Sequence, residues 1–411
     1  MKLQIAALFL LAGSLGAGAA DLQFTPLFNG KDFAGWVGGG YEVKDGCIVP
    51  GPKAKFIHTE KRYANYVFEF DFRLPPGGNN GIGIHYPGHG DAAYTSMEIQ
   101  VLDNSAKQYK KLLPAQYHGS IYKLVAAKRG FLKPVGQWNH ERITVDGPVV
   151  KVELNGTLIT EGNLDELEKS HPNHQGVKRR AGFIALCGHH SDVRFRNLRI
   201  AELPPAFDAK AAKANGYKPL LDDSLSAWKY KGKAAEHWKI VNGILGGDGQ
   251  GADLWTKKPY GDIELLVDWR WPEPGPKRKR PVIKPDGTEK KGAGVEVEEL
   301  DSGIYLRGNS KSQVNLWNWP CGSGEVYGYR TAKDTPPEVR AAVTPKTKAD
   351  KPLGEWNRMK ITMKGDRLSV TLNGKKVIDN AQLPGVPKSG PIALQHHHAP
   401  IDFANIWIKE L

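Results

Sequence analysis

Cysteine is scarce in this chain of 411 residues, which has only Cys47, Cys187 and Cys321. Three thiols cannot build the dense disulfide framework that small secreted domains use in place of a large core. Two arrangements fit the count: a single Cys47–Cys187 bond formed after export, or three buried thiols. Hydrophobic cores must therefore supply the stability, and 40% hydrophobic with 25% charged residues is typical of globular proteins.

Long apolar runs are also lacking. The most apolar stretch follows Lys2, covers residues 5–11 and gives way to small residues at 16–20. A basic start, a short apolar run and small residues are typical of a secretory signal peptide, and the run is too short to cross a bilayer. We therefore expect a signal peptide at residues 1–20, a periplasmic or secreted protein, and no insertion into the membrane.

Acidic residues are too few to balance the basic ones, and the net charge is +13. Part of the excess lies in the Lys-Arg-Lys-Arg run at residues 277–280. Such a run can bind nucleic acid or another anion. Because prolines surround it on both sides, a solvated loop is the better interpretation, and we predict no nucleic-acid partner.

Helical patterns are rare and occur only at residues 163–169 and 208–214. Elsewhere the period is two: residues 68–73 alternate phenylalanine with charged side chains, as a half-buried strand does. Asn-Gly pairs at 155–156 and 373–374 follow alternating segments and predict two-residue hairpins. Many short strands punctuated by Gly and Pro predict an all-β fold of antiparallel sandwiches.

Residues 27–200 and 220–408 carry the same pattern twice. A repeat this long is a duplicated domain, and each copy should fold around its own core. We predict a first domain at 21–202, a linker at 203–219 and a second domain at 220–411. Matching landmarks in the two repeats are 63–73 with 260–270, Trp138-Asn139 with Trp356-Asn357, and Leu154-Asn155-Gly156 with Leu372-Asn373-Gly374.

One strand of the first repeat, residues 96–103, is unusually polar. Glu98 and Gln100 share one face, whereas Asp103 falls on the other face of a regular strand. A bulge at residues 101–102 would return Asp103 to the side of Glu98. Two carboxyl groups on one surface can divide acid and base duties. The alternative is a polar solvent-facing side of an outer sheet.

Polar residues near other strand ends add Asn80, His85, Tyr122 and His189 to the candidates. Histidines at 189–190 and 396–398 can ligate a metal, but adjacent residues of a strand point to opposite faces, so no single strand presents a complete site. We therefore expect no required cofactor, with a divalent cation as the open alternative.

The ordered set of motifs resembles the 3-keto-disaccharide hydrolase family. Its members in this chain are Phe28-Asn29-Gly30-Lys31, Gly35-Trp36, Asn80-Gly81-Ile82, Glu98 to Asn104, Gly119-Ser120-Ile121-Tyr122, Trp138-Asn139, Leu154-Asn155-Gly156, His189 and Phe195-Arg196-Asn197. The second repeat resembles the family through Asp301 to Tyr305, Trp356-Asn357, Asn373-Gly374 and Leu394 to His397. Departures are Asn80, where serine is usual, and Cys187, where glutamine is usual. The resemblance implies a fold class of two tandem concanavalin A-like jelly-roll β-sandwiches.

The resemblance also implies a hydrolase acting on 3-keto-disaccharides or 3-keto-glucosides. A ketone at C3 acidifies the C2 proton, a base removes it, the enolate expels the C1 substituent, and water adds back. We expect Glu98, Gln100 and Asp103 to share a concave pocket with His189, Tyr122 and Arg196. The candidate roles are Glu98 or His189 as base, Arg196 or a cation at the enolate, and Tyr122, His85 or Asp103 at the leaving group.

The second repeat replaces the polar strand. Glu98 corresponds to Gln313, Gln100 to Asn315 and Leu102 to Trp317. An amide cannot accept a proton at neutral pH as a carboxylate does, whereas amides beside exposed tryptophans suit sugar hydroxyls and faces. We therefore predict a sugar-binding or site-completing second domain. The candidate substrate-binding residues are His85, Gln100, Asn80, Trp138, Arg307, Gln313, Asn315, Trp317 and His397.

Two rival functions remain open at this point. The spacing of Glu98, Gln100 and Asp103 resembles the catalytic strand of laminarinase-type retaining glucanases, although that strand normally carries a central aspartate and a final glutamate. A non-catalytic carbohydrate-binding protein is the third interpretation, because jelly rolls host all three functions.

Overall fold

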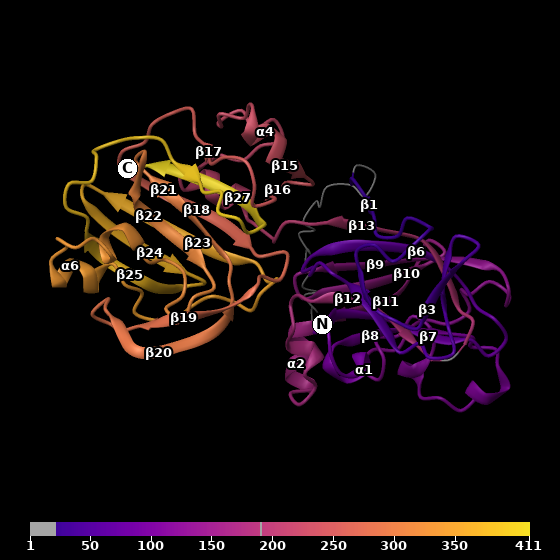
Figure 1. Cartoon of the computed structure of the whole chain (residues 1–411). Helices are drawn as coiled ribbons and strands as arrows, with labels where there is room; N and C mark the ends of the chain where they lie inside the picture. The colour runs from indigo at the N-terminus through magenta and orange to yellow at the C-terminus, as the bar shows by residue number, and fades with distance from the viewer. Residues whose placement is uncertain (1–21, 190) are drawn as a thin grey trace, which may run out of the picture.

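The computed structural model describes residues 22–189 and 191–411. Figure 1 shows two β-rich halves, the first coloured indigo to magenta and the second orange to yellow. The predicted signal peptide at residues 1–20 lies outside the described residues.

The first half consists of short antiparallel strands with a few helical turns between them. Its strands are β1 (Thr25–Pro26), β2 (Trp36–Gly38), β3 (Tyr41–Lys44), β4 (Cys47–Pro50), β5 (Phe56–Thr59), β6 (Tyr66–Arg73), β7 (Asn79–Tyr86), β8 (Met97–Leu102), β9 (Trp138–Asp146), β10 (Val149–Leu154), β11 (Thr157–Asn163), β12 (Phe183–Gly188) and β13 (Arg194–Glu202). Its helices are α1 (Ala92–Thr95) and α2 (Leu164–Ser170), with 3-10 turns η1 (Lys107–Tyr109), η2 (Pro114–Gln116) and η3 (Gly176–Lys178).

Two sheets face each other in this half. The larger has the order β11-β10-β9-β6-β13-β4-β3, with β1 on β13, and the smaller has the order β2-β5-β12-β7-β8. Neighbouring strands in both sheets are antiparallel. The strand orders also show that the chain crosses repeatedly from one sheet to the other.

Helix α3 (Ala209–Ala214) precedes the second half, which repeats the same plan. The strands are β14 (Lys218–Pro219), β15 (Trp238–Val241), β16 (Ile244–Gly247), β17 (Leu254–Trp255), β18 (Ile263–Arg270), β19 (Lys277–Ile283), β20 (Glu289–Glu298), β21 (Asp301–Leu306), β22 (Asn309–Trp317), β23 (Asn357–Lys364), β24 (Arg367–Leu372), β25 (Lys375–Gln382), β26 (Ala393–Leu394) and β27 (Ile401–Glu410). The helices are α4 (Lys233–His237), α5 (Tyr327–Arg330) and α6 (Pro337–Ala342). The sheet orders are β15-β16-β27-β18-β23-β24-β25, with β14 on β27, and β17-β26-β21-β22; β19 and β20 form a separate ribbon.

Each half buries its own hydrophobic cluster between its sheets. Phe68, Phe70 and Phe72 alternate along β6 and are fully buried, as Val267 and Trp269 are on β18 of the second half. Burying one such side chain contributes roughly 1.5–3 kcal/mol of transfer free energy. The structure confirms the predicted fold class, all-β with two tandem jelly-roll sandwiches.

The local sequence signals also correspond to elements. The Asn155-Gly156 turn joins β10 to β11 with φ angles of 49° and 84°, the left-handed geometry of a tight hairpin. Asn373-Gly374 does the same between β24 and β25. Both predicted helical segments form, α2 with Asn163 and α3 with Asp208 as the N-terminal cap.

The structure corrects the prediction for the basic run and decides between the two arrangements of the cysteines. The basic run at residues 277–280 is a strand of the β19–β20 ribbon and not a loop; Lys277 pairs with Glu296, and Arg280 with Glu299. Acidic side chains beside the run therefore neutralise part of its charge.

The three cysteines are free among the described residues, with Cys47 and Cys187 buried, which favours the buried-thiol alternative.

The predicted bulge in the polar strand is also wrong. Pairing of β8 with β7 keeps one register, from Met97 opposite Ile84 to Leu102 opposite Asn79. Asp103 therefore follows the last residue of β8 and lies beyond the pleated face that carries Glu98.

Buried charges join the two halves. The Arg270 guanidinium, fully buried, donates to Asp402 at 2.9 Å and contacts Glu202, which ends the last strand of the first half. Lys61 of the first half lies 2.6 Å from the other oxygen of Glu202. An apolar cluster of Ala64, Ile244, Trp356 and Ala404 packs in the same interface. The halves are therefore held by matched charges as well as by apolar contact.

Candidate functional site

A cavity of about 170 Å³ lies on the outer face of the smaller sheet in the first half. Side chains alternate along β8, so that Met97, Ile99 and Val101 enter the core while Glu98 and Gln100 face the cavity. Typical drug-sized ligand pockets measure ~300–1,000 Å³, so this one is smaller than usual. The lining residues are Asn79, Asp91, Ala93, Tyr94, Glu98, Gln100, Leu102, Tyr109, Leu112, Gln116, Tyr122 and His189.

Glu98 occupies a space that a glycine leaves open. A Cβ atom on Gly81 of the neighbouring β7 would overlap the carboxylate of Glu98. The carboxylate is only 5% exposed, and among the described residues its Oε1 atom has no hydrogen-bond donor. A buried, unsatisfied carboxylate oxygen costs free energy unless a ligand or water completes it. Glu98 is therefore a candidate for ligand binding.

His189 follows β12 and faces Glu98 from beyond the adjacent strand. Its Nε2 atom lies 3.8 Å from Oε1 of Glu98. Interaction with Glu98 raises the pKa of His189 above its ordinary value, although burial partly opposes that change. The cavity thus contains a carboxylate that raises the pKa of a nearby imidazole, an arrangement that makes the pair a candidate acid–base site.

Amides and a phenol complete the wall. Gln100 Nε2 donates to Asn79 Oδ1 at 2.8 Å, and Gln116 Nε2 donates to the Tyr122 hydroxyl at 2.9 Å. Because the Tyr122 oxygen accepts this bond, its own proton is directed to another acceptor. Four of the predicted site residues meet in this cavity: Glu98, Gln100, Tyr122 and His189.

Sequence reasoning missed several lining residues, including Asn79 and Gln116. Asn79 lies two residues before Gly81 on β7, so period two places it on the cavity face and was a usable signal. Gln116 belongs to the 3-10 turn η2 in a long loop, where no periodicity applies.

Asp103 is absent from the cavity wall, which corrects its predicted role. Its Oδ2 atom accepts from the Gly77 amide at 2.8 Å, and Oδ1 accepts from Ser105 at 2.9 Å from the amide and 2.6 Å from the hydroxyl. Burial alone would raise the pKa of Asp103, but these hydrogen bonds outweigh it and lower the pKa. Asp103 therefore holds two loops together.

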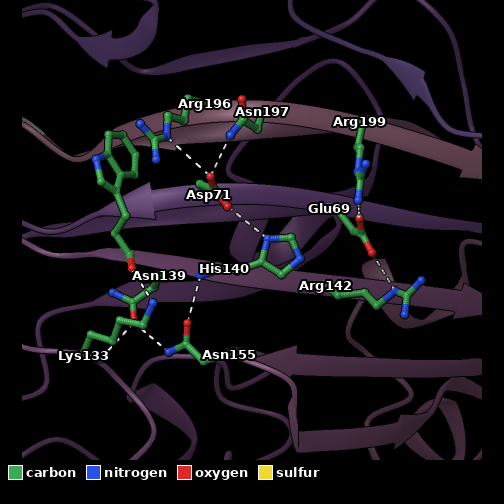
Figure 2. Close-up of polar contacts among 11 residues, drawn as sticks. Glu69, Asp71, Lys133, Asn139, His140, Arg142, Asn155, Arg196, Asn197 and Arg199 are labelled. Carbon is green, nitrogen blue, oxygen red and sulfur yellow. Dashed lines mark hydrogen bonds and ion pairs between the residues drawn. The ribbon is translucent and has the colours of Figure 1, made fainter.

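Arg196 and Trp138 lie on the outer face of the larger sheet, away from the cavity. The Arg196 guanidinium lies 3.9 Å from the centroid of the Trp138 ring and 3.4 Å from Asp71. Figure 2 shows Arg196 and Asn197 converging with His140 on Asp71, across three neighbouring strands. The predicted roles of Arg196 at an enolate and of Trp138 in substrate binding are therefore not supported by their positions.

The second repeat retains two of the three side-chain contacts of Asp71; the Arg196 contact is not retained, because Ala404 lies opposite Asp268. Asp268 there accepts from Arg358 at 2.7 Å and from Asn405 at 2.8 Å, as Asp71 does from His140 and Asn197. The Asn139–Asn155 bond of 2.9 Å, drawn in Figure 2, likewise recurs as Asn357–Asn373 at 2.8 Å. Contacts retained in both copies are most simply structural.

Three further candidates, Asn80, His85 and Arg307, are buried and do not line the cavity that contains Glu98 and His189. Asn80 is fully buried, and its Oδ1 accepts from the Gly81 amide at 2.8 Å. His85 contacts the carbonyls of Ala64 and Arg179, and burial lowers its pKa to about 4. Arg307, its counterpart in the second repeat, donates to the carbonyls of Gly261, Gly365 and Pro387. His85 and Arg307 hold loops through these carbonyls, and neither they nor Asn80 line the cavity that contains Glu98 and His189.

Two larger cavities, about 560 and 540 Å³, have walls from both repeats. The first is lined by residues such as His58, Lys61 and Glu273, and the second by Arg62, Arg179 and Glu355. We place the candidate site in the smaller cavity because it alone of these three contains the facing carboxylate and imidazole.

Comparison with known proteins connects this geometry to a family. The sequence profile of the 3-keto-alpha-glucoside-1,2-lyase-like domain matches residues 23–201 and again residues 216–409. The chain belongs to this family. Each match covers one sandwich, in agreement with the resemblance seen in the sequence.

Individual relatives are more distant. A 3-keto-disaccharide hydrolase of Bacteroides thetaiotaomicron is 28% identical over 228 residues, 44% of this chain and 78% of the relative. A solved structure of a suspected glycosyl hydrolase from Parabacteroides distasonis is 28% identical, with a TM-score of 0.40 over 44% of this chain and 99% of its own. A Bacillus subtilis protein with a galectin-like fold is 10% identical, with a TM-score of 0.33 over 44% and 95%. Family membership makes this protein a carbohydrate-active enzyme.

The second lyase-like domain does not present the predicted aromatic surface. Trp317 is 1% exposed, its indole N–H donates to the Gly322 carbonyl, and Trp319 stacks on it with centroids 4.2 Å apart. Arg280 of the ribbon also packs against Trp319, 4.7 Å from its centroid. The predicted sugar contact at Trp317 is therefore wrong, because the ring is part of a buried stack.

The remaining candidates of the second domain, Gln313, Asn315 and His397, lie on or beside the outer face of its smaller sheet. Gln313 Nε2 donates to the Gln395 side chain at 2.7 Å.

Neither domain shows three or more His, Cys, Asp or Glu side chains gathered as metal ligands within the described residues. The same part of the chain has no helix long and apolar enough to span a membrane.

Proposed function

We propose that the first domain cleaves 3-keto-glycosides by removing the C2 proton and eliminating the C1 substituent. The observation that carries this proposal is the enclosed Glu98 carboxylate, open at Oε1 and 3.8 Å from His189. Family membership and the name of the Bacteroides relative support the substrate class.

The roles follow from the geometry of the cavity. Glu98 takes the C2 proton, and the electron pair of the broken C–H bond forms an enolate with the C3 ketone. His189, 3.8 Å from Glu98, donates a hydrogen bond that stabilises this enolate in place of the distant Arg196. Tyr122 donates its phenolic proton toward the departing C1 oxygen, because Gln116 already donates to the Tyr122 oxygen. Water then adds to the unsaturated sugar: its hydroxyl group bonds to C1, its remaining proton restores Tyr122, and Glu98 returns its proton to C2.

The rival functions are less well supported. A retaining glucanase needs two carboxyl groups about 5–5.5 Å apart across the substrate. Asp103 is engaged with Gly77 and Ser105, and Asp91 in the cavity wall caps helix α1 through the Ala93 amide at 2.9 Å. A binding-only protein would offer an open aromatic platform, whereas this cavity encloses a carboxylate. We also infer that the enzyme acts in the periplasm or outside the cell, on the strength of the N-terminal sequence pattern.

Product analysis tests the proposal directly. Turnover of methyl 3-keto-α-glucoside should be detected, whereas unoxidised methyl α-glucoside should remain intact. Glu98→Gln should lower turnover of the first domain's reaction by about 10²–10⁴-fold with a smaller change in binding, since general-base catalysis is worth that factor. Glu161→Gln is the matched control, because that side chain is 54% exposed on the far sheet.

A second readout follows the His189 pKa. Replacing Glu98 by glutamine removes the charge that raises this pKa, so the NMR titration midpoint of His189 should fall. Cleavage of the unoxidised glucoside at the same rate, or an unchanged rate in Glu98→Gln at every pH, would contradict the proposed chemistry.

A further inference from the structure

The second domain preserves the geometry around Glu98 while changing its chemistry. A Cβ atom on Gly303 of β21 would overlap the amide of Gln313, just as one on Gly81 would overlap Glu98. Gln313 therefore occupies the equivalent position on β22. Because an amide is not a base at neutral pH, a second active site would need its carboxylate elsewhere.

A carboxylate is present one strand away. Asp301 begins β21 opposite Trp317, as Asn79 begins β7 opposite Leu102. These registers place Asp301 at the position of Asn79. Leu186 opposite Ile82 and Leu394 opposite Ile304 likewise place His397, three residues after Leu394, at the position of His189. Oδ2 of Asp301 lies 3.4 Å from Nδ1 of His397. The domains thus both contain an acid–histidine pair, but the acid comes from the neighbouring strand.

The surroundings of Asp301 favour proton transfer near neutral pH. Burial raises its pKa to about 7, opposed by the nearby Arg280 cation of the ribbon. The pKa of His397 is lowered by burial and by His398, while Asp253 acts in the opposite direction. The Asp301 side chain is 21% exposed, so solvent still reaches it. Asp301 can therefore exchange a proton within roughly one unit of neutral pH, the range that suits a general base.

One buried polar atom without a partner lies on the neighbouring strand, where Asn315 pairs with Gly303, two residues along β21 from Asp301. Asn315 is 3% exposed, and among the described residues its Oδ1 atom has no hydrogen-bond donor. Strand alternation places Asn315 on the same face as Gln313, whose amide is oriented by Gln395 at 2.7 Å. A buried acceptor left open beside a titratable pair is a feature that a ligand hydroxyl would satisfy.

We propose that the second domain holds a second acid–base site for oxidised pyranosides, in which Asp301 replaces Glu98 and His397 replaces His189. The inference rests on the proposed function of the first domain. In this site Asp301 takes the C2 proton, the C–H electron pair forms the enolate, and the C1–O bond breaks. Protonated Asp301 passes this proton to the leaving oxygen, and water then adds its hydroxyl group to C1 and its proton to C2, so that the overall reaction is hydrolysis.

The test compares four full-length proteins: wild type, Glu98→Gln, Asp301→Asn and the double variant. Asp301→Asn should fold, because Asn79 occupies the equivalent position in the first domain; its melting temperature checks this. Asp286→Asn on the exposed turn of the ribbon is the control for loss of a carboxylate. Turnover of methyl 3-keto-α-glucoside is measured from pH 5 to pH 9.

We expect Glu98→Gln to retain a residual rate with an inflection near pH 7, and the double variant to lose at least a further tenfold. His397→Gln should reduce that same residual rate, which provides a second route if Asp301→Asn is unstable. Equal rates in Glu98→Gln and the double variant at every pH, with Asp301→Asn at the wild-type rate, would overturn the second site and leave the first intact.

The opposite pattern separates the two proposals. A wild-type rate in Glu98→Gln combined with a loss of 10²-fold or more in Asp301→Asn would refute the role of Glu98 and support the role of Asp301. Loss of all turnover in Glu98→Gln alone would instead assign the whole reaction to the first domain and overturn the present inference.

Discussion

Single glycines decide where two polar side chains lie on the outer sheet faces. Gly81 and Gly303 leave the space into which Glu98 and Gln313 fold back across the sheet. The carboxylate then sits in a low-dielectric enclosure beside His189, where electrostatic interactions are stronger than in water. At the scale of the residue, the lack of a side chain at Gly81 is as necessary to this arrangement as Glu98 itself.

Gly81→Ala should therefore displace the Glu98 carboxylate and lower turnover of the keto-glucoside by about 10²-fold, the effect of roughly 1 Å of misplacement. Steady-state kinetics and a melting curve measure activity and stability separately. Gly39→Ala is the control, since a Cβ atom there meets no atom within 4 Å. Full activity in Gly81→Ala would show that the carboxylate position is not critical.

At the scale of the element, the two domains share their Asn-Gly hairpins and a set of hydrogen bonds at matching positions. The indole N–H of Trp36 donates to the Leu27 carbonyl at 2.6 Å, and that of Trp228 donates to Leu220 at the same distance. The Thr59 hydroxyl accepts from the Ile184 amide at 3.1 Å, as Thr256 does from Ile392 at 3.0 Å. Contacts that both domains share identify the fold. Positions that differ between the two domains are the candidates for a functional site.

The two Asn-Gly turns offer a paired stability test. Gly156 and Gly374 adopt φ angles of 84° and 79°, and a Cβ atom added at either glycine would meet no other atom within 4 Å. Alanine at either turn should therefore cost about 1–2 kcal/mol, the backbone penalty of the left-handed region. Urea unfolding measures this cost, and equal stability of either variant and wild type would contradict the assigned turn geometry.

At the scale of the whole molecule, the interface between domains depends on compensated buried charge. Arg270 lies between Glu202 and Asp402, and Lys61 adds a second cation to Glu202. Burial acts to raise the pKa of Glu202, but Arg270 and Lys61 outweigh it, and the pKa is lowered below its ordinary value. The pairing requires both partners, because removing one leaves an uncompensated charge.

Arg270→Met should destabilise the folded chain by about 3–5 kcal/mol at neutral pH, the usual cost of breaking a buried pair. Because the folded pKa of Glu202 is depressed, its stabilising contribution is present above the unfolded pKa and is lost as pH falls through the folded pKa. The difference between wild type and variant in urea unfolding should therefore shrink in acid. Lys44→Met, which removes an exposed pair with Glu42, is the control. A constant difference at all pH values would exclude Glu202 from the coupling.

Much of the architecture could be predicted because its signals are local. Period two in residues 68–73 specifies one apolar face in the core and one charged face away from it, and Asn-Gly at 155–156 specifies a tight turn from backbone sterics alone. Glu98, Gln100, Tyr122 and His189 were also found, since strand alternation and the family motifs are properties of the sequence. The duplication needed only comparison of the chain with itself.

Sequence alone determined the strand pattern, the turns, the duplication and the family, because each depends on neighbours in the chain. Tertiary structure alone decided which polar residues meet. It placed Arg196 on the opposite sheet, turned Asp103 into a loop contact, buried Trp317 under Trp319, and brought Asp301 within 3.4 Å of His397. The physical reason is that alternation fixes the face of a residue within its strand, whereas the partner across that face depends on sheet order, register and packing between segments far apart in the chain.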